Sequence, residues 1–208
     1  MSKKLTSILI PQAVFFDFDL TLVDSLSAGK NLLNALKKHG IDYTKIPFKD
    51  IWGMKLEELC RMLTAFSLPP RTAAEIKKMN IGCMRQYYAG CLVVGRRFLR
   101  ELEARGIKTA IVSNNASVVI NSVLRASRNK DIHFDVVLSS GHLRGHASKG
   151  AAILWLCREM GLQPNQVWYV GDHPNDIYSA REAGVRAISV ATGLHSSSVL
   201  SRYHPDLI

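Results

Sequence analysis

The chain has 208 residues, of which 47% are hydrophobic, and a formal net charge of +10. This length is enough for one large hydrophobic core, or for a core domain with a smaller inserted domain. No stretch reaches the ~18–20 apolar residues that span a bilayer. The apolar run Leu5 to Ile10 is cut short by Pro11, and no cleavage pattern of small residues follows it. We therefore expect a soluble, cytoplasmic protein without a membrane partner.

Cysteine spacing and the distribution of charge argue against a metal-cluster protein and against a nucleic-acid-binding tail. Cys60, Cys83, Cys91 and Cys157 lie far apart without a Cys-x-x-Cys pair, so we expect reduced core thiols and no metal cluster. No Lys/Arg block is long enough for a nucleic-acid-binding tail, so nucleic acid is not the expected partner. Residues 22–92 hold 11 Lys or Arg and 6 Asp or Glu, half of the excess charge. This region is either a solvated basic surface, which we favour, or one that attracts an anionic ligand.

A pair of acids follows the first apolar run. Val14 to Phe16 predicts a buried strand, and Asp17 and Asp19 come directly after it. In extended backbone two residues at this spacing point to the same side and can converge. Burying both charges is costly unless a cation or a shared proton offsets them. The pair fits either a metal-assisted phosphoryl-transfer site or a solvated strand end with two capping acids.

The next segment has helical spacing throughout. Apolar residues between positions 25 and 89 recur every three or four residues, and no strand interrupts them. A segment of this length between two strands is longer than an ordinary connection. We therefore predict an α-helical cap domain over residues 22–91, inserted into a core of residues 1–21 and 92–208.

From Gly95 onward, helices and strands alternate. The first predicted helix ends at Gly106, and the second covers 118–124. The third covers 148–160 and is ended by Gly161, and the fourth runs from Pro174 to Gly184. The predicted strands cover 108–112, 134–138, 167–170 and 186–190. Alternation of this kind predicts an α/β fold: a Rossmann-like parallel sheet with helices on both faces, in three α/β/α layers.

Polar side chains follow several of the predicted strands. In open parallel sheets, ligands bind beyond the carboxyl ends of the strands. The side chains expected to meet at that edge are Asp17, Asp19, Ser113, Asn114, Lys149, Asp172 and Asp176. Taken singly, Ser113 could cap a helix and Lys149 could be a solvated first-turn lysine. Together they favour a catalytic site.

These motifs resemble those of the haloacid dehalogenase superfamily of aspartate-nucleophile phosphotransferases. The resemblance is closest to the branch with phosphoglycolate phosphatases and β-phosphoglucomutase, whose helical cap follows the first motif. The residues that match its four motifs in order are Asp17, Asp19 and Thr21, then Ser113, then Lys149, then Gly171, Asp172 and Asp176. The sequence departs from the family pattern at Gly150, where Pro is common, and at His173, where small residues are frequent. His173 could reach toward the site or lie in the turn before Pro174, and we favour the turn.

The resemblance implies a role for each matched residue. Asp17 would attack phosphorus and form an aspartyl-phosphate, while Asp19 would act as acid and then as base. The phosphoryl oxygens would be held by Ser113, Asn114 and Lys149. An acid at Asp19 favours phosphate esters over halide displacement, because halide needs no leaving-group proton.

The resemblance also implies a Mg²⁺ site. The expected ligands are the Asp17 carboxylate, the Asp19 backbone carbonyl and the Asp172 carboxylate. Asp176 and Thr21 are not expected to bind the ion directly, but to orient the groups that do.

The expected function is therefore a Mg²⁺-dependent phosphatase for a small phosphomonoester: phosphoglycolate, a sugar phosphate or a nucleotide-like compound. The alternatives are a phosphomutase on the same scaffold, or a non-catalytic basic protein that binds nucleic acid or a protein partner. Substrate choice is expected to depend on the cap. Its loop 51–55 either contacts the ligand, with Gly53 allowing close backbone approach and Lys55 pairing with a second anion, or is an ordinary helix start with Trp52 packed beneath it. The oligomeric state is left open.

Overall fold

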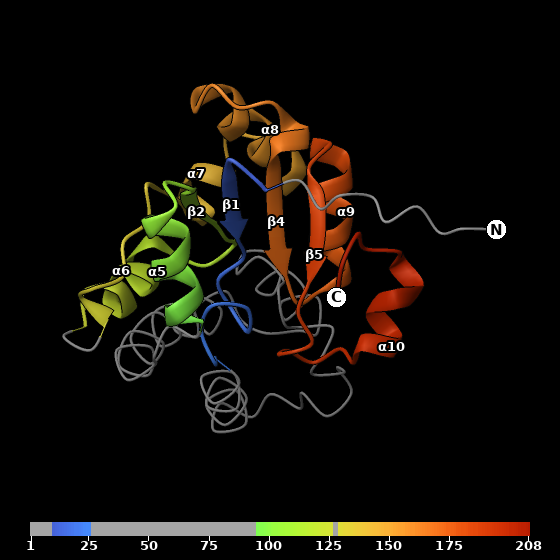
Figure 1. The fold of residues 1–208 in the computed structure, drawn as a ribbon, viewed down its shortest axis with the longest axis horizontal. Coiled ribbons are helices and arrows are strands. Elements are labelled where there is room, and N and C mark those ends of the chain that lie inside the picture. Colours follow the sequence, from blue (N-terminus) through green and yellow to red (C-terminus); the bar gives the residue numbers. More distant parts are fainter. Residues whose placement is uncertain (1–9, 26–94, 127–128) are drawn as a thin grey trace, which may run out of the picture.

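The computed structural model describes residues 10–25, 95–126 and 129–208 (Figure 1). Within them lies one five-stranded parallel sheet of order β3-β2-β1-β4-β5. The strands are β1 (Ala13–Phe16), β2 (Lys108–Val112), β3 (Val136–Leu138), β4 (Val167–Gly171) and β5 (Arg186–Ser189). This order places β1 at the centre, between β2 and β4, so the residues that follow β1 are flanked by two other strand ends.

The described helices include the four that the sequence predicts. The helices are α5 (Arg96–Ala104), α6 (Ser117–Leu124), α7 (Ser140–Leu143), α8 (Lys149–Glu159), α9 (Pro174–Ala183) and α10 (Ser197–Leu200), with 3₁₀ turns η3 (Pro164–Gln166) and η4 (Ser201–Tyr203). The glycines expected to end helices, Gly106, Gly161 and Gly184, have φ of 69°, 68° and 72°, the left-handed conformation typical of such positions. The sequence did not predict α7 and α10, because four residues are too few to show an apolar period.

One strand is shorter than expected. The apolar pattern predicts a strand over 134–138, whereas β3 begins at Val136. The backbone N–H of Thr109 donates to the carboxylate of Asp135 at 2.7 Å, in the place where a strand would offer a backbone carbonyl. The side chain of Asp135 therefore ends the ladder early.

Alternating strand residues pack on opposite faces of the sheet. Phe15 and Tyr169 lie in one buried cluster with residues of α8 and α9. Phe16 and Val170 lie in a second cluster with residues of α5 and α6. These two clusters give three layers, so the predicted α/β/α fold class is confirmed.

Some sequence predictions lie outside the described residues. The helical cap and its loop 51–55 fall almost entirely there, as do Cys60, Cys83 and Cys91. Of the residues assigned to the cap, 22–25 are described, and Leu22 and Val23 among them pack in the second core cluster. Cys157 is a buried free thiol, as expected, and burial raises its pKa to about 11. In the described segments, no helix combines the length and hydropathy needed to cross a membrane.

Candidate active site

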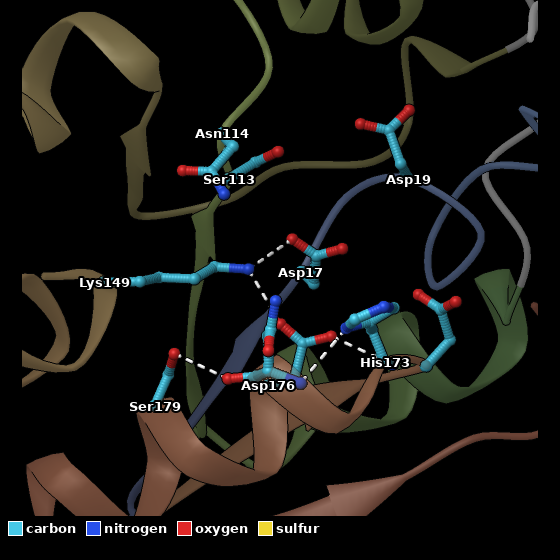
Figure 2. Close-up of a pocket in the computed structure, with 10 residues that line it drawn as sticks. Asp17, Asp19, Ser113, Asn114, Lys149, His173, Asp176 and Ser179 are labelled. Carbon is cyan, nitrogen blue, oxygen red and sulfur yellow. Dashed lines mark hydrogen bonds and ion pairs between the residues drawn. The ribbon is translucent and has the colours of Figure 1, made fainter. Parts of the chain in front are cut away.

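A polar pocket of about 240 Å³ lies at the carboxyl end of the sheet (Figure 2). Its lining includes all the predicted site residues except Thr21. The lining residues are Asp17, Asp19, Ser113, Asn114, Lys149, Asp172, His173, Asn175, Asp176 and Ser179. The sheet order therefore brings together side chains from the ends of three strands and from two helices.

Asp17 is held rigidly at the end of β1. Its backbone N–H donates to the carbonyl of Val170 at 2.8 Å, so the hydrogen-bond ladder to β4 continues for one residue past the strand. Its carboxylate oxygen Oδ1 lies 2.7 Å from the Nζ of Lys149. The side chains of both residues are almost fully buried, with 13% and 12% exposed. A carboxylate fixed in this way is preorganised, because neither its backbone nor its counter-ion can drift.

Lys149 joins two carboxylates. Its ammonium also lies 2.8 Å from Oδ1 of Asp176, and 5.3 Å from the centre of the Tyr169 ring. Burial alone would lower the pKa of Lys149, but the carboxylates of Asp17 and Asp176 outweigh burial and raise that pKa well above its ordinary value. Lys149 therefore remains an ammonium and can offset the charge of a bound phosphate.

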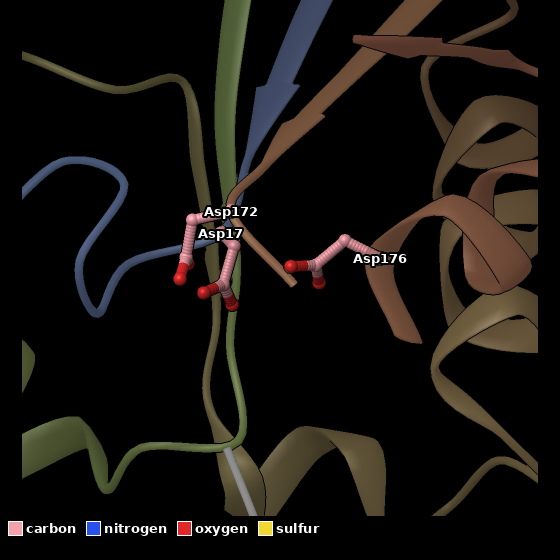
Figure 3. Close-up of side chains that lie close together, drawn as sticks. All are labelled: Asp17, Asp172 and Asp176. Atoms are coloured by element: carbon pink, nitrogen blue, oxygen red, sulfur yellow. The ribbon is translucent and has the colours of Figure 1, made fainter. Parts of the chain in front are cut away.

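Three carboxylates form a tight group. One oxygen from each of Asp17, Asp172 and Asp176 lies within 4.8 Å of the others (Figure 3). Burial raises the pKa of Asp17 well above its usual range despite Lys149, and the neighbouring carboxylates raise it further. Burial, with the Asp176 carboxylate, raises the pKa of Asp172 to about 7. A hard divalent cation with oxygen ligands, such as Mg²⁺, fits this donor set and would relieve the repulsion.

The contacts of Asp176 and Asp172 distinguish their roles. Oδ1 of Asp176 accepts from Lys149, and its Oδ2 accepts from the backbone N–H of His173 at 3.1 Å. Asp172 is held differently, because its Oδ1 accepts from the hydroxyl of Thr21 at 3.0 Å. With both oxygens engaged by protein donors, Asp176 is better placed to position Lys149 than to bind a cation. These contacts favour the orienting roles expected for Asp176 and Thr21.

Asp19 lies in the pocket but apart from that group. Figure 2 shows its carboxylate directed away from Asp17. The chain turns directly after Asp19, where Leu20 adopts a left-handed φ of 58°. Instead, Oδ2 of Asp19 accepts a 3.0 Å hydrogen bond from Nδ2 of Asn115. The two carboxylates thus share the pocket without converging on one point.

Ser113 follows β2 and is buried. Its hydroxyl oxygen accepts from the backbone N–H of Asn115 at 3.1 Å. The hydroxyl hydrogen therefore cannot point at Asn115 and is available to a different acceptor, such as a phosphoryl oxygen. Asn114 lines the same pocket.

Five contributors are absent from the sequence prediction: Asn175 and Ser179, which line the pocket, and Asn115, Tyr169 and Gly193. Asn115 follows the predicted motif at the same strand end, so its position alone could have identified it. Tyr169 carries no such signal, since a tyrosine within an apolar strand is normally interpreted as a core residue. Gly193 was also missed, and a Cβ there would lie 1.9 Å from Oδ2 of Asp172. Only glycine therefore lets that loop approach Asp172 so closely.

His173 lies in the turn before Pro174, as expected. Its Nδ1 accepts from the backbone N–H of Asn175 at 3.1 Å and so caps α9. Its ring also lines the pocket and packs edge-on against His195, with ring centres 4.7 Å apart.

Known proteins resemble this chain in sequence and in fold. The sequence model of haloacid dehalogenase-like hydrolases matches residues 14–190. A phosphoglycolate phosphatase from Synechococcus elongatus is 29% identical over 203 residues, or 94% of this chain and 91% of that protein.

Two solved structures share the fold. A haloacid dehalogenase-like hydrolase from Bacteroides fragilis has a TM-score of 0.79 and 26% identity, over 95% of this chain and 96% of that one. A predicted phosphoglycolate phosphatase from Haemophilus somnus has a TM-score of 0.80 and 22% identity, over 97% and 94% of the two chains.

Proposed function

Because the chain belongs to the haloacid dehalogenase-like hydrolase family and is a phosphatase, we propose that it hydrolyses a small phosphomonoester through a phosphorylated Asp17. The observation that carries this proposal is the buried Asp17 carboxylate, paired with Lys149 and grouped with two further carboxylates in one pocket. The first substrate to test is phosphoglycolate, because relatives across the whole chain carry that name.

In the first step, a carboxylate oxygen of Asp17 forms a bond to phosphorus while the bond from phosphorus to the ester oxygen breaks. Asp19 gives a proton to the leaving oxygen, which departs as an alcohol. Attack in line places this oxygen on the far side of phosphorus from Asp17, so an acid displaced from the Asp17 carboxylate is suitably located. Lys149 and the Ser113 hydroxyl offset charge on the phosphoryl oxygens.

In the second step, water attacks the phosphorus of the phosphorylated Asp17. Asp19, now a carboxylate, takes a proton from that water. The bond from phosphorus to Asp17 breaks, which releases inorganic phosphate and restores both side chains to their starting states.

Mg²⁺ would be held by the carboxylates of Asp17 and Asp172, with the Asp19 backbone carbonyl as the third expected ligand. When bound, this ion screens the negative charges that the phosphate and the carboxylates bring together. Thr21 fixes Asp172 for this task through its 3.0 Å hydrogen bond.

Of the earlier alternatives, the phosphomutase uses the same first step. It would return the phosphoryl group from Asp17 to a substrate oxygen and not to water. The non-catalytic binding protein is not carried further, since family membership confirms the expected enzyme.

A panel of small phosphomonoesters tests the proposal. We expect wild type to release phosphate with Mg²⁺ and not with excess chelator. Asp17→Asn, which keeps the shape of the side chain but is not a carboxylate nucleophile, should lose activity by about 10³-fold or more. Asp131→Asn is the control, because Asp131 is an exposed acid that pairs with Arg96 and Arg100.

Two outcomes would contradict the proposal. Phosphate release that is equal in Asp17→Asn and wild type would exclude Asp17 as nucleophile. Isomerised phosphoester without free phosphate would identify a mutase.

A further inference from the structure

We infer that Asn115 is a positioning residue that holds Asp19 for proton transfer, an inference that rests on the proposed function. Asn115 follows Ser113 and Asn114 at the end of β2. Its Nδ2 donates to Oδ2 of Asp19 at 3.0 Å, across 96 positions of sequence. None of the four family motifs includes Asn115, yet it contacts the proposed acid directly.

The orientation of the Asn115 amide follows from its other contacts. Its Oδ1 accepts the backbone N–H of Ala116 at 2.8 Å, and only the oxygen of an amide can do so. The nitrogen must therefore face Asp19. The side chain of Asn115 therefore presents only N–H donors to Asp19, and no acceptor.

This donor selects which oxygen of Asp19 carries the proton. A proton on Oδ2 would face the N–H of Asn115, donor against donor. Protonation is therefore expected on Oδ1, which makes Oδ1 the atom that gives the proton to the leaving oxygen and later receives one from water. The amide also steadies the ionised carboxylate that remains after the first transfer.

The backbone of Asn115 is itself fixed at both ends. Its N–H donates to the hydroxyl of Ser113, and its carbonyl accepts from the backbone N–H of Ser140 at 2.9 Å. A single residue thus ties the proposed acid to the proposed phosphate-binding hydroxyl. The position of Asp19, and with it the distance from Asp19 to the leaving oxygen, is then set by the backbone at the end of β2.

Asn115→Asp isolates the donated hydrogen bond. The new carboxylate can still accept from Ala116, and the backbone contacts to Ser113 and Ser140 need no side chain. Only the donation to Asp19 is lost, and a like charge replaces it. The like charge repels the Asp19 carboxylate, so the contact that fixes the orientation of Asp19 is lost.

The test compares leaving groups. We measure kcat/KM, which reports the steps up to phosphorylation of Asp17, for an alkyl phosphate and for para-nitrophenyl phosphate. Nitrophenolate leaves without a proton, whereas an alkoxide needs one. Asn115→Ala should lower kcat/KM by about 30–100-fold for the alkyl ester and by less than about 5-fold for the nitrophenyl ester. Asn115→Asp should likewise lower kcat/KM more for the alkyl ester than for the nitrophenyl ester. Asn165→Asp, an exposed asparagine in η3 before β4, is the matched control.

The ratio between the two substrates is taken within one variant, so it does not depend on the fraction of folded protein. Equal losses on both esters, or no loss on the alkyl ester, would overturn the role of Asn115 and leave the phosphatase intact. If wild type cleaves neither ester with Mg²⁺, the proposed function fails, and the role of Asn115 fails with it.

Discussion

At the residue scale, Lys149 connects the charges of the pocket. Its ammonium contacts Asp17 and Asp176, and the ring of Tyr169 lies against it. The Tyr169 hydroxyl lies 3.1 Å from the carbonyl of Val112 and 3.4 Å from Asp176. Burial raises the pKa of Tyr169 well above its ordinary value, so it remains a phenol and can donate. A buried hydroxyl thus links the end of β2 to the carboxylate that positions Lys149.

Tyr169→Phe removes this hydroxyl and keeps the ring. The Val112 carbonyl and the Asp176 carboxylate then lose a buried donor, so the free energy of unfolding should fall by about 1–3 kcal/mol. Urea denaturation measures the change. Tyr178→Phe, at a tyrosine that is 52% exposed, should leave stability within about 0.5 kcal/mol. Equal effects of the two substitutions would show that the Tyr169 hydroxyl has no structural role.

The pKa of Asp172 predicts how Mg²⁺ binding depends on pH. Its folded-state pKa of about 7 lies above the ordinary value of 3.8, so without metal the native state binds the extra proton and loses stability as pH rises from 4 to 7. A cation requires the ionised form, so Mg²⁺ affinity should be at least about tenfold weaker at pH 6 than at pH 8, because the pKa of Asp17, the other carboxylate ligand, is raised as well. Calorimetric titration at both values checks this. Asp172→Asn should bind Mg²⁺ weakly at both, and a pH-independent Kd in wild type would contradict the prediction.

At the element scale, α8 and α9 meet at a position where side-chain size is limited. A Cβ on Gly150 would lie 2.4 Å from Oε2 and 2.7 Å from the Cβ of Glu182. The carboxylate of Glu182 also accepts from the hydroxyl of Ser148, the N-cap of α8, at 2.5 Å. Gly150, where the family commonly has Pro, therefore has a steric reason: it leaves room for the side chain of Glu182.

A double-mutant cycle tests this packing. Gly150→Ala in wild type should reduce the free energy of unfolding by about 1–3 kcal/mol, because Glu182 must move. In a Glu182→Gly background the whole clashing side chain, its Cβ included, is absent, so the same change should stabilise α8 by about 0.5–1 kcal/mol through helix propensity. Urea denaturation of the four proteins measures the coupling. Equal effects of Gly150→Ala in both backgrounds would show that the two residues do not compete for space.

At the scale of the whole molecule, the pocket depends on two apolar clusters that hold the helices against the sheet. Leu156 on α8 is 1% exposed within the first cluster. The same helix begins with Lys149, so packing near its end helps to determine where the ammonium lies. Displacement of α8 would therefore affect the site as well as the core.

Leu156→Ala should lower the free energy of unfolding by about 2–5 kcal/mol, since it removes buried methyl groups and leaves a cavity. Thermal and urea unfolding measure this loss. Arg158→Ala, an exposed change on the same helix, should stay within about 0.5 kcal/mol. Similar losses for the two variants would mean that burial of α8 contributes little to stability.

Sequence alone determined the strands, the longer helices and their glycine ends, because these follow from local periodicity and backbone preference. It also located the pocket edge and identified Asp17, Ser113 and Asp172, since polar residues directly after apolar strands mark the carboxyl ends of a parallel sheet. Lys149, in the first turn of a helix, was identified by its match to the third family motif. Their chemical roles, and the helical cap, remain predictions.

Only the tertiary structure decided which side chains touch. The ion pair between Lys149 and Asp17 spans 132 positions, and the hydrogen bond from Thr21 to Asp172 spans 151. The Asp19 carboxylate accepts a hydrogen bond from Asn115, although its spacing predicted convergence with Asp17. Local patterns carry no information on such contacts, because strand order and the approach of loops set them. Of the two acids, which are separated by one residue, Asp17 is thus a preorganised carboxylate paired with Lys149. Asp19 lies apart from it and has Asn115 as its own partner.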